Sequence, residues 1–138
     1  MQTLGITALL IAVVGGLSTL FISGESDQLA SEPTDAQAIT HEAIAVEVEN
    51  NDATLLDVRT AAEYQDGYIS PAENYPLQLI QQGEMPDIAL DEKIYLYCRS
   101  GNRSAQAEAI LKEAGFSRVI DLGGLPDMLR IGGEITTD

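Results

Sequence analysis

The amino-acid sequence predicts an α/β fold in which helices flank a mostly parallel central sheet, giving three layers. Residues 53–58, 94–97 and 119–122 are mostly apolar and rich in β-branched or aromatic side chains. Such runs are typical of strands that are buried on both faces. Segments with helical spacing separate these runs, and parallel strands need crossover connections of this kind. The alternation therefore predicts a sheet that is covered on both sides.

Turn and capping signals place shorter elements between these strands. Thr40 is expected to cap the first helix, Thr60 and Glu63 have the spacing of a capping box, and Gly115 should end the longest helix. In chain order, the predicted elements are a short strand at 39–40, a helix over 41–49, the strand 53–58, a helix over 60–67, extended segments at 68–69 and 73–75 around a turn at 70–71, a helix over 76–82, the strand 94–97, a helix over 104–114, the strand 119–122 and a short helix over 126–130.

The composition excludes several classes of function. The chain has 138 residues, with 22 Asp and Glu against 7 Lys and Arg, and its formal net charge is −15. Such an acidic surface argues against binding to nucleic acid or to anionic lipid. A single cysteine excludes an internal disulfide, a CxxC redox pair and a cysteine-rich zinc site.

The N-terminus carries an uncharged apolar stretch from Leu4 to Ser23. Its length is about that of a membrane-spanning helix, so residues 1–24 are expected to form a hydrophobic helix that serves as a membrane anchor or an export signal. No Lys or Arg precedes Arg59, so a basic n-region is missing and the positive-inside rule has nothing to count. An uncleaved anchor is favoured over cleavage after Gly24.

Residues 25–37 are rich in Ser, Glu, Asp and Ala and show no apolar periodicity. This composition predicts a flexible acidic linker, followed by a folded domain over residues 38–138. We expect a membrane-anchored or exported protein whose domain lies on the extracytoplasmic (periplasmic) side, and we expect it to be a monomer.

Chemistry is expected at Cys98, the only cysteine, which directly follows the strand 94–97. In a parallel sheet, ligands bind beyond the carboxyl ends of the strands. A helix begins soon after Cys98, and its unpaired N–H groups and dipole would stabilise an anion. Gly101 lets several N–H groups point inward, and Arg99 and Arg103 add positive charge. These features favour a reactive thiolate over a small buried hydrophobe, which is the commoner role of a lone cysteine.

We expect different roles for the two arginines of the loop and for the only histidine. Arg103 is the better candidate for an anion ligand, because a residue at the junction of loop and helix can turn inward, whereas Arg99 fits ordinary surface charge more easily. His41 stands at a predicted helix start, far in sequence from the loop. We therefore expect His41 at the surface and not as a general base.

Several motifs together resemble the rhodanese family and occur in the order found there. They are LLDVR at 55–59, EY at 63–64, GYI at 67–69, PAENYPL at 71–77, YLYCRSGNRSA at 95–105, AGF at 114–116 and VIDLGGL at 119–125. The resemblance covers about residues 39–133. The ending GGLPDM at 123–128 is most similar to the small exported single-domain rhodaneses of the phage-shock response.

The resemblance implies a sulfurtransferase that moves sulfane sulfur from thiosulfate or a similar donor, through a persulfide on Cys98, to a thiol or cyanide acceptor. We expect neither a metal ion nor an organic cofactor, because this sulfur-transfer chemistry requires none. Asp57 and Arg59 would form a buried ion pair that supports the loop. The sequence departs from the family at Tyr68, where a histidine is usual, and at Met128, where an aromatic residue is frequent. The donor would be held by Arg99, Ser100, Gly101, Asn102 and Arg103.

Two other functions remain open from the sequence. Phosphatases and arsenate reductases use similar loops, but Cys98 and Arg103 are separated by four residues, one fewer than in those loops. The shorter loop is a tighter cradle, better suited to a sulfane sulfur than to a tetrahedral phosphate. The other alternative is a module that binds sulfide or polysulfide, or a protein partner, without catalysis.

Overall fold

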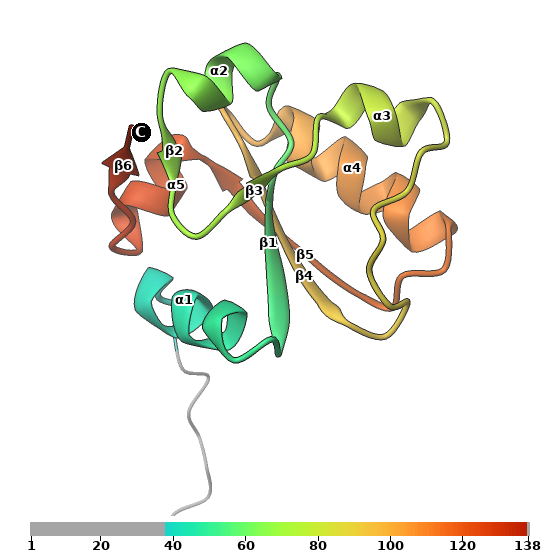
Figure 1. Ribbon diagram of the computed structural model, residues 1–138, viewed down its shortest axis with the longest axis horizontal. Coiled ribbons are helices and arrows are strands. Elements are labelled where there is room, and N and C mark those ends of the chain that lie inside the picture. The colour runs from blue at the N-terminus through green and yellow to red at the C-terminus, as the bar shows by residue number, and fades with distance from the viewer. Residues whose placement is uncertain (1–37, 138) are drawn as a thin grey trace, which may run out of the picture. The chain divides into compact units, whose positions relative to one another are not determined.

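A four-stranded parallel sheet forms the centre of the computed structural model, which describes residues 38–137 (Figure 1). The strand order is β3-β1-β4-β5, and every neighbouring pair is parallel. The prediction of an α/β fold with a mostly parallel central sheet is therefore confirmed. The strands are β1 (Ala53–Asp57), β3 (Glu73–Asn74), β4 (Lys93–Cys98) and β5 (Arg118–Gly124).

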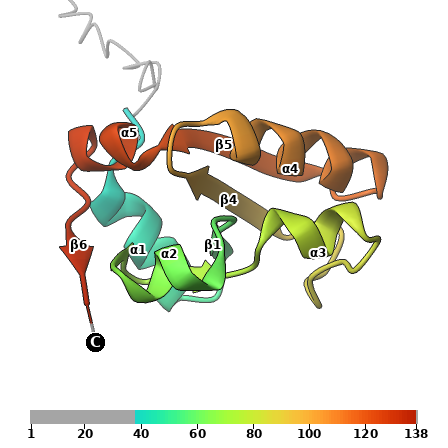
Figure 2. The same cartoon turned by 90° about the horizontal axis from the view of Figure 1, so that it is seen from above.

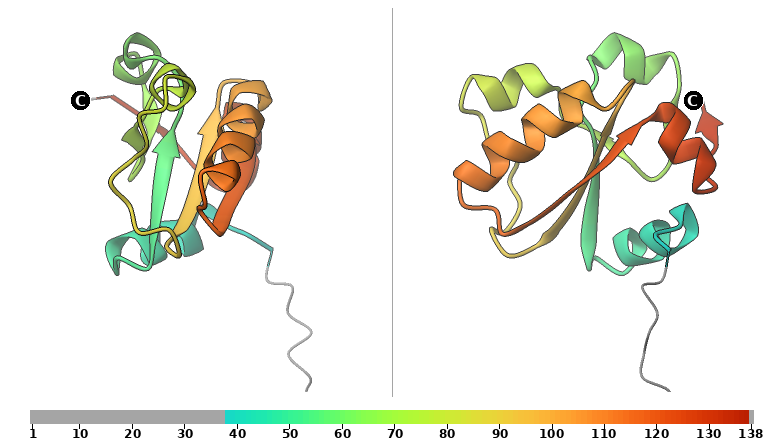
Figure 3. Two further views of the ribbon diagram at one scale, coloured as in Figure 1. Left: turned by 90° about the vertical axis from the view of Figure 1, so that its right-hand side faces the viewer. Right: turned by 180° about the vertical axis from the view of Figure 1, so that it is seen from behind.

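Helices pack on both faces of this sheet and complete the three layers (Figures 2 and 3). One face packs against α3 (Leu77–Gln81) and α4 (Asn102–Glu113). The other packs against α1 (His41–Glu49) and α5 (Leu125–Arg130), through side chains such as Ile44 and Met128.

Both faces of β4 are buried, which explains why its sequence is apolar without interruption. Successive side chains of a strand point to opposite faces. Ile94, Leu96 and Cys98 belong to the core beneath α3 and α4, whereas Tyr95 and Tyr97 belong to the core beneath α1 and α5. The same alternation places Cys98 on the side of the sheet where α4 begins.

The predicted caps are present in the structure. The Thr40 hydroxyl accepts a hydrogen bond from the Ala43 N–H at 3.2 Å, at the start of α1. A capping box opens α2 (Ala61–Gln65): the Thr60 N–H donates to the Glu63 carboxylate at 3.1 Å, and the Thr60 hydroxyl accepts from the Glu63 N–H. The short helices therefore begin close to the positions that their capping residues predict.

The structure differs from the prediction at several element boundaries. The predicted strand at 39–40 is wrong: Thr40 has extended dihedral angles (φ −112°, ψ 152°) because it is an N-cap, but it pairs with no strand. Helix α4 begins at Asn102 and not at residue 104, and α5 begins one residue earlier than predicted, at Leu125.

A second, two-stranded sheet was not predicted. The strand β2 (Tyr68–Ile69) pairs antiparallel with β6 (Ile135–Thr136) near the C-terminal end of the described residues. Two-residue strands carry too little periodicity to be recognised from sequence.

The predicted membrane segment and linker, residues 1–24 and 25–37, lie outside the described residues and stay predictions. Within residues 38–137, no helix has both the length and the apolar character needed to cross a membrane.

The core of the sheet gives a direct test of this packing. Leu96→Ala removes a side chain that is 0% exposed at the centre of β4. We expect it to lower the free energy of unfolding by about 2–5 kcal/mol, because the surrounding side chains cannot fill the cavity. Urea denaturation followed by circular dichroism measures this loss. Leu129→Ala, at a residue that is 47% exposed, should change stability by no more than about 0.5 kcal/mol. Equal losses in the two variants would contradict the packing described here.

Candidate active site

The candidate site lies at the carboxyl edge of the parallel sheet, where β4 ends in Cys98. Cys98 has no exposed surface, and its residue position pairs with Gly124 of β5. The chain then turns through residues 99–101 and enters α4 at Asn102. The predicted arrangement of strand, cysteine, loop and helix is therefore present.

Two hydrogen-bond donors contact the sulfur of Cys98. The Gly101 N–H points at Sγ from 3.0 Å, and the Ser104 hydroxyl lies 3.5 Å from it. Gly101 has a φ of 90°, a left-handed conformation that glycine adopts without strain, and it turns the chain back over the sulfur. The loop thus surrounds Sγ with donors, as an anion-binding nest does.

Ser104 is a site residue that the sequence reasoning missed. It is fully buried, and its single hydroxyl proton has three acceptors within reach: Sγ, the Gly101 carbonyl at 3.1 Å and the Gly123 carbonyl at 3.2 Å. The negative charge of a thiolate favours donation to Sγ. Its place in the first turn of a helix suggested only an ordinary helix start. Its position six residues after Cys98 could have indicated this role, because the loop turns back and brings the first turn of α4 against the cysteine.

The surroundings of Cys98 act on its pKa in opposite directions. Burial raises the pKa of the thiol, because it disfavours the charged form. Hydrogen bonds from the Ser104 hydroxyl and from the backbone N–H groups of Ser104, Ser100 and Gly101 lower it, and the net effect places the pKa of Cys98 below its ordinary value. The loop therefore favours the thiolate, as expected from the sequence, with backbone and hydroxyl donors in direct contact with it.

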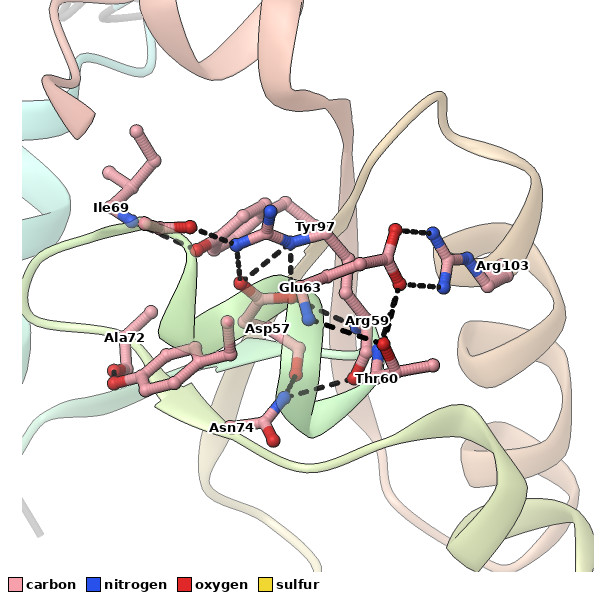
Figure 4. Close-up of polar contacts among 11 residues, drawn as sticks. Asp57, Arg59, Thr60, Glu63, Ile69, Ala72, Asn74, Tyr97 and Arg103 are labelled. Carbon is pink, nitrogen blue, oxygen red and sulfur yellow. Dashed lines mark hydrogen bonds and ion pairs between the residues drawn. The ribbon is translucent and has the colours of Figure 1, made fainter. Parts of the chain in front are cut away.

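Arg103 is held by a carboxylate from another element. Its guanidinium forms two hydrogen bonds to Glu63 of α2, at 2.7 and 2.8 Å (Figure 4). This pairing, opposed by burial and assisted by Thr60, lowers the pKa of Glu63 to about 2. Arg103 therefore ties the start of α4 to α2 and is not a free cation in this structure.

The remaining loop residues differ from Arg103 in their surroundings. Arg99 is exposed and forms no ion pair with any residue in the range 38–137. The Asn102 side chain accepts a hydrogen bond from Gln106 at 2.7 Å, within its own helix. Ser100 forms an isolated antiparallel bridge with Gly124. The sequence favoured Arg103 over Arg99 as an anion ligand, but the structure leaves Arg99 as the uncommitted arginine of the loop.

The buried ion pair expected between Asp57 and Arg59 is present (Figure 4). Arg59 also donates to the Gly67 carbonyl at 2.7 Å, and its guanidinium lies 5.8 Å from the centre of the Tyr97 ring. The Tyr97 oxygen in turn accepts a hydrogen bond from the Ile69 N–H at 3.0 Å. This network joins β1, β4 and the segment 67–69 at the carboxyl edge of the sheet.

The end of β5 supports the cysteine loop through close backbone contact. The Leu125 N–H donates to the Arg99 carbonyl at 3.2 Å. A Cβ atom at Gly124 would lie 2.7 Å from the Arg99 oxygen and 2.8 Å from the Ser100 Cα. Only glycine therefore allows β5 and the loop to approach this closely.

A pocket of about 300 Å³ lies beside the loop. Cys98 is not among its lining residues, whereas its neighbour Arg99 is, so the pocket reaches the loop at that residue. The lining residues are Arg59, Glu63, Asp66, Gly67, Arg99, Leu125 and Ile135.

His41, the only histidine, lies away from the cysteine loop. Its Nε2 is 2.6 Å from the Ser70 carbonyl oxygen, and the residue is half-buried at the start of α1. Across the described residues, no group of three or more His, Cys, Asp or Glu side chains is arranged to hold a metal ion.

Removing the Ser104 hydroxyl should weaken the stabilisation of the thiolate. In Ser104→Ala the thiolate loses a donor, so we expect the pKa of Cys98 to rise by about half a unit to one unit. The rate of alkylation by iodoacetamide against pH measures this value, and the only cysteine gives the only signal. Ser117→Ala, which removes an exposed hydroxyl bonded to the Leu90 carbonyl, should leave the profile unchanged. An unchanged profile in Ser104→Ala would refute the role given to its hydroxyl.

A methyl group at Gly124 should displace the loop. In Gly124→Ala we expect stability to fall by about 1–3 kcal/mol through overpacking, and the pKa of Cys98 to rise as its donors move away. Gly83→Ala serves as the control, because Gly83 has a φ of 86° but faces open space. That control should lose about 1 kcal/mol through backbone strain and keep the alkylation profile of the parent protein. If both variants gave the same profile, Gly124 would not support the loop.

Comparison with known proteins gives the family. A model of the rhodanese-like domain matches residues 40–128. A protein named sulfurtransferase from Allochromatium vinosum is 42% identical over 76 residues, which are 55% of this chain and 70% of that protein. The thiosulfate sulfurtransferase PspE of Escherichia coli is 34% identical over 76 residues, 53% of this chain and 71% of that protein.

A solved structure agrees with these matches. It is described as a rhodanese with anions from E. coli, has a TM-score of 0.54 and 29% sequence identity, and covers 62% of this chain and 99% of its own. The relatives named above support sulfur transfer as the general activity. The match over most of the folded region, together with the cysteine loop, shows that the chain belongs to the rhodanese family.

Proposed function

We propose that this protein takes sulfane sulfur from thiosulfate or a similar small donor onto Cys98 and passes it to a thiophilic acceptor. The observation that carries the proposal is the contact of Sγ with the Gly101 N–H and the Ser104 hydroxyl. These donors favour a thiolate at a buried position, and a thiolate is the nucleophile that sulfur transfer needs. The name of the relative from Allochromatium vinosum supports sulfur transfer in general, and that of the Escherichia coli relative supports thiosulfate as the donor.

In the first step, the Cys98 thiolate attacks the outer sulfur of thiosulfate. The new S–S bond forms as the bond between the two sulfur atoms of the donor breaks, and sulfite leaves with the electron pair of that bond. Cys98 then carries a persulfide, whose outer sulfur lies about 2 Å beyond Sγ. No proton transfer is required, so the reaction does not depend on a histidine base.

The loop amides have a second role while the persulfide exists. Its outer sulfur carries negative charge, and N–H groups that are already oriented stabilise such charge without reorganisation. In the second step, an acceptor such as cyanide or a thiolate attacks the outer sulfur, and the S–S bond to Cys98 breaks. The acceptor leaves with that sulfur, and the Cys98 thiolate is restored. The cycle requires neither an oxidant nor a reductant.

The Glu63–Arg103 pair argues against the phosphatase alternative. A phosphatase loop of this kind needs its arginine to hold two oxygens of a phosphate, and here the Arg103 guanidinium already forms two hydrogen bonds to Glu63. The close approach of the Gly101 N–H to Sγ also leaves a tight cradle. Both features favour a single sulfur atom over a tetrahedral oxyanion at the centre of the loop.

The decisive variant is Cys98→Ser. We expect it to form no thiocyanate from thiosulfate and cyanide, because serine cannot carry a persulfide. Mass spectrometry of the parent protein after thiosulfate treatment should show the addition of one sulfur atom, absent from Cys98→Ser. His41→Gln removes the only histidine, away from the loop, and should retain turnover.

Three outcomes would change the assignment. Turnover by Cys98→Ser would refute it. A stable persulfide that no acceptor discharges would favour the binding module. Hydrolysis of an aryl phosphate that depends on Cys98 would revive the phosphatase alternative.

A further inference from the structure

The pocket beside the cysteine loop contains two kinds of charged side chains. Arg59 and Glu63 are already paired, with Asp57 and Arg103 respectively. Arg99 and Asp66 line the same pocket, and the side chain of neither forms an ion pair or a hydrogen bond with any residue in the range 38–137. The pocket therefore offers one uncommitted cation and one uncommitted anion.

Both uncommitted charges stand on well-defined backbone. Asp66 caps the C-terminal end of α2, and its N–H donates to the Ala62 carbonyl at 3.1 Å. The next residue, Gly67, is held by the hydrogen bond of its carbonyl with Arg59. On the other side, the Arg99 carbonyl accepts from Leu125, as described above. The two charges thus come from two segments that meet at the pocket: the end of α2 and the loop between β4 and α4.

The rest of the pocket suits a small molecule with a short apolar part. Leu125 and Ile135 complete the wall, and Ile135 is 51% exposed. A volume of about 300 Å³ is at the lower end of the range for small-ligand sites. The cation of Arg99 and the anion of Asp66 match the two opposite charges of a zwitterion.

We propose that this pocket binds the amino-acid part of the sulfur acceptor, and that the acceptor is a small zwitterionic thiol such as free cysteine. Its carboxylate pairs with Arg99, its ammonium group pairs with Asp66, and its sulfur faces the loop next to Cys98. This inference rests on the proposed function, because it names the acceptor for the second step of that reaction.

The transfer to such an acceptor balances without a further reagent. The acceptor thiol loses its proton to solvent, and its thiolate attacks the outer sulfur of the Cys98 persulfide. One S–S bond forms and one breaks. The products are a persulfide of the acceptor and the Cys98 thiolate, so no net oxidation occurs.

The test uses the full chain, loaded with sulfur from thiosulfate and freed of excess donor before an acceptor is added. Loading first removes any effect of Arg99 on donor binding from the measurement. Four thiols separate the charges: cysteine carries both groups, cysteamine only the ammonium, mercaptopropionate only the carboxylate, and mercaptoethanol neither. The rate of persulfide loss from Cys98 is measured by mass spectrometry for each thiol, and each variant is compared with the parent protein using the same thiol.

Each variant should affect only the thiols that carry the matching charge. Asp66→Asn should slow discharge to cysteine and cysteamine by about two- to fivefold, the effect expected of a solvent-exposed charge pair, and spare the other two thiols. Arg99→Gln should slow discharge to cysteine and mercaptopropionate by a similar factor. Asp87→Asn removes an exposed carboxylate that does not line the pocket, and should change none of the rates.

The possible failures can be told apart. If thiosulfate leaves no persulfide on Cys98 of the parent protein, the proposed function fails, and this inference fails with it. If the persulfide forms and discharges, but Asp66→Asn slows all four thiols equally or none of them, only the inference is refuted. The same holds if Asp87→Asn reproduces the pattern of Asp66→Asn, because the effect would then come from net charge.

Discussion

The carboxyl edge of the sheet depends on the buried ion pair between Asp57 and Arg59. Burying two charges carries a desolvation penalty, and such a pair is tolerated when further hydrogen bonds satisfy its atoms. Here Asp57 also accepts from the Arg59 N–H at 2.9 Å, and Arg59 donates to the Gly67 carbonyl. These bonds hold the segment that carries Asp66 against the end of β1. The same ion pair therefore stabilises both the pocket wall at residues 66–67 and the end of β1.

A strongly acidic chain must stabilise a thiolate by local means. At Cys98 the structure does so with backbone N–H groups and one hydroxyl, which act at contact distance and need no net positive charge. Arg59 and Arg103 are neutralised by carboxylates, so they contribute mainly to position. Arg99 is the loop arginine that remains available to a charged ligand. The donors at the sulfur and the unpaired arginine at the pocket are therefore different groups.

Most of the fold was predictable because its signals are local. The apolar runs of β1, β4 and β5 and the capping box at Thr60 each depend on neighbours within a few residues. The prediction was wrong at residues 39–40, where an N-cap has the same extended backbone as a strand. The pairing of β2 with β6 was missed, because two short segments that are far apart in sequence leave no periodic pattern.

The sequence by itself determined the alternation of strands and helices and the place of Cys98 between a strand and a glycine-containing loop, since each follows from residues that are close along the chain. Only the tertiary structure decided which charges are committed. Glu63 and Arg103 are 40 residues apart and form an ion pair, whereas Asp66 and Arg99 share a pocket without pairing. Such relations depend on how α2, β4 and α4 pack together, and on the direction of each side chain. Cys98 could therefore be named from the sequence as the candidate nucleophile, whereas the charges that stay available to a ligand are defined only by the fold.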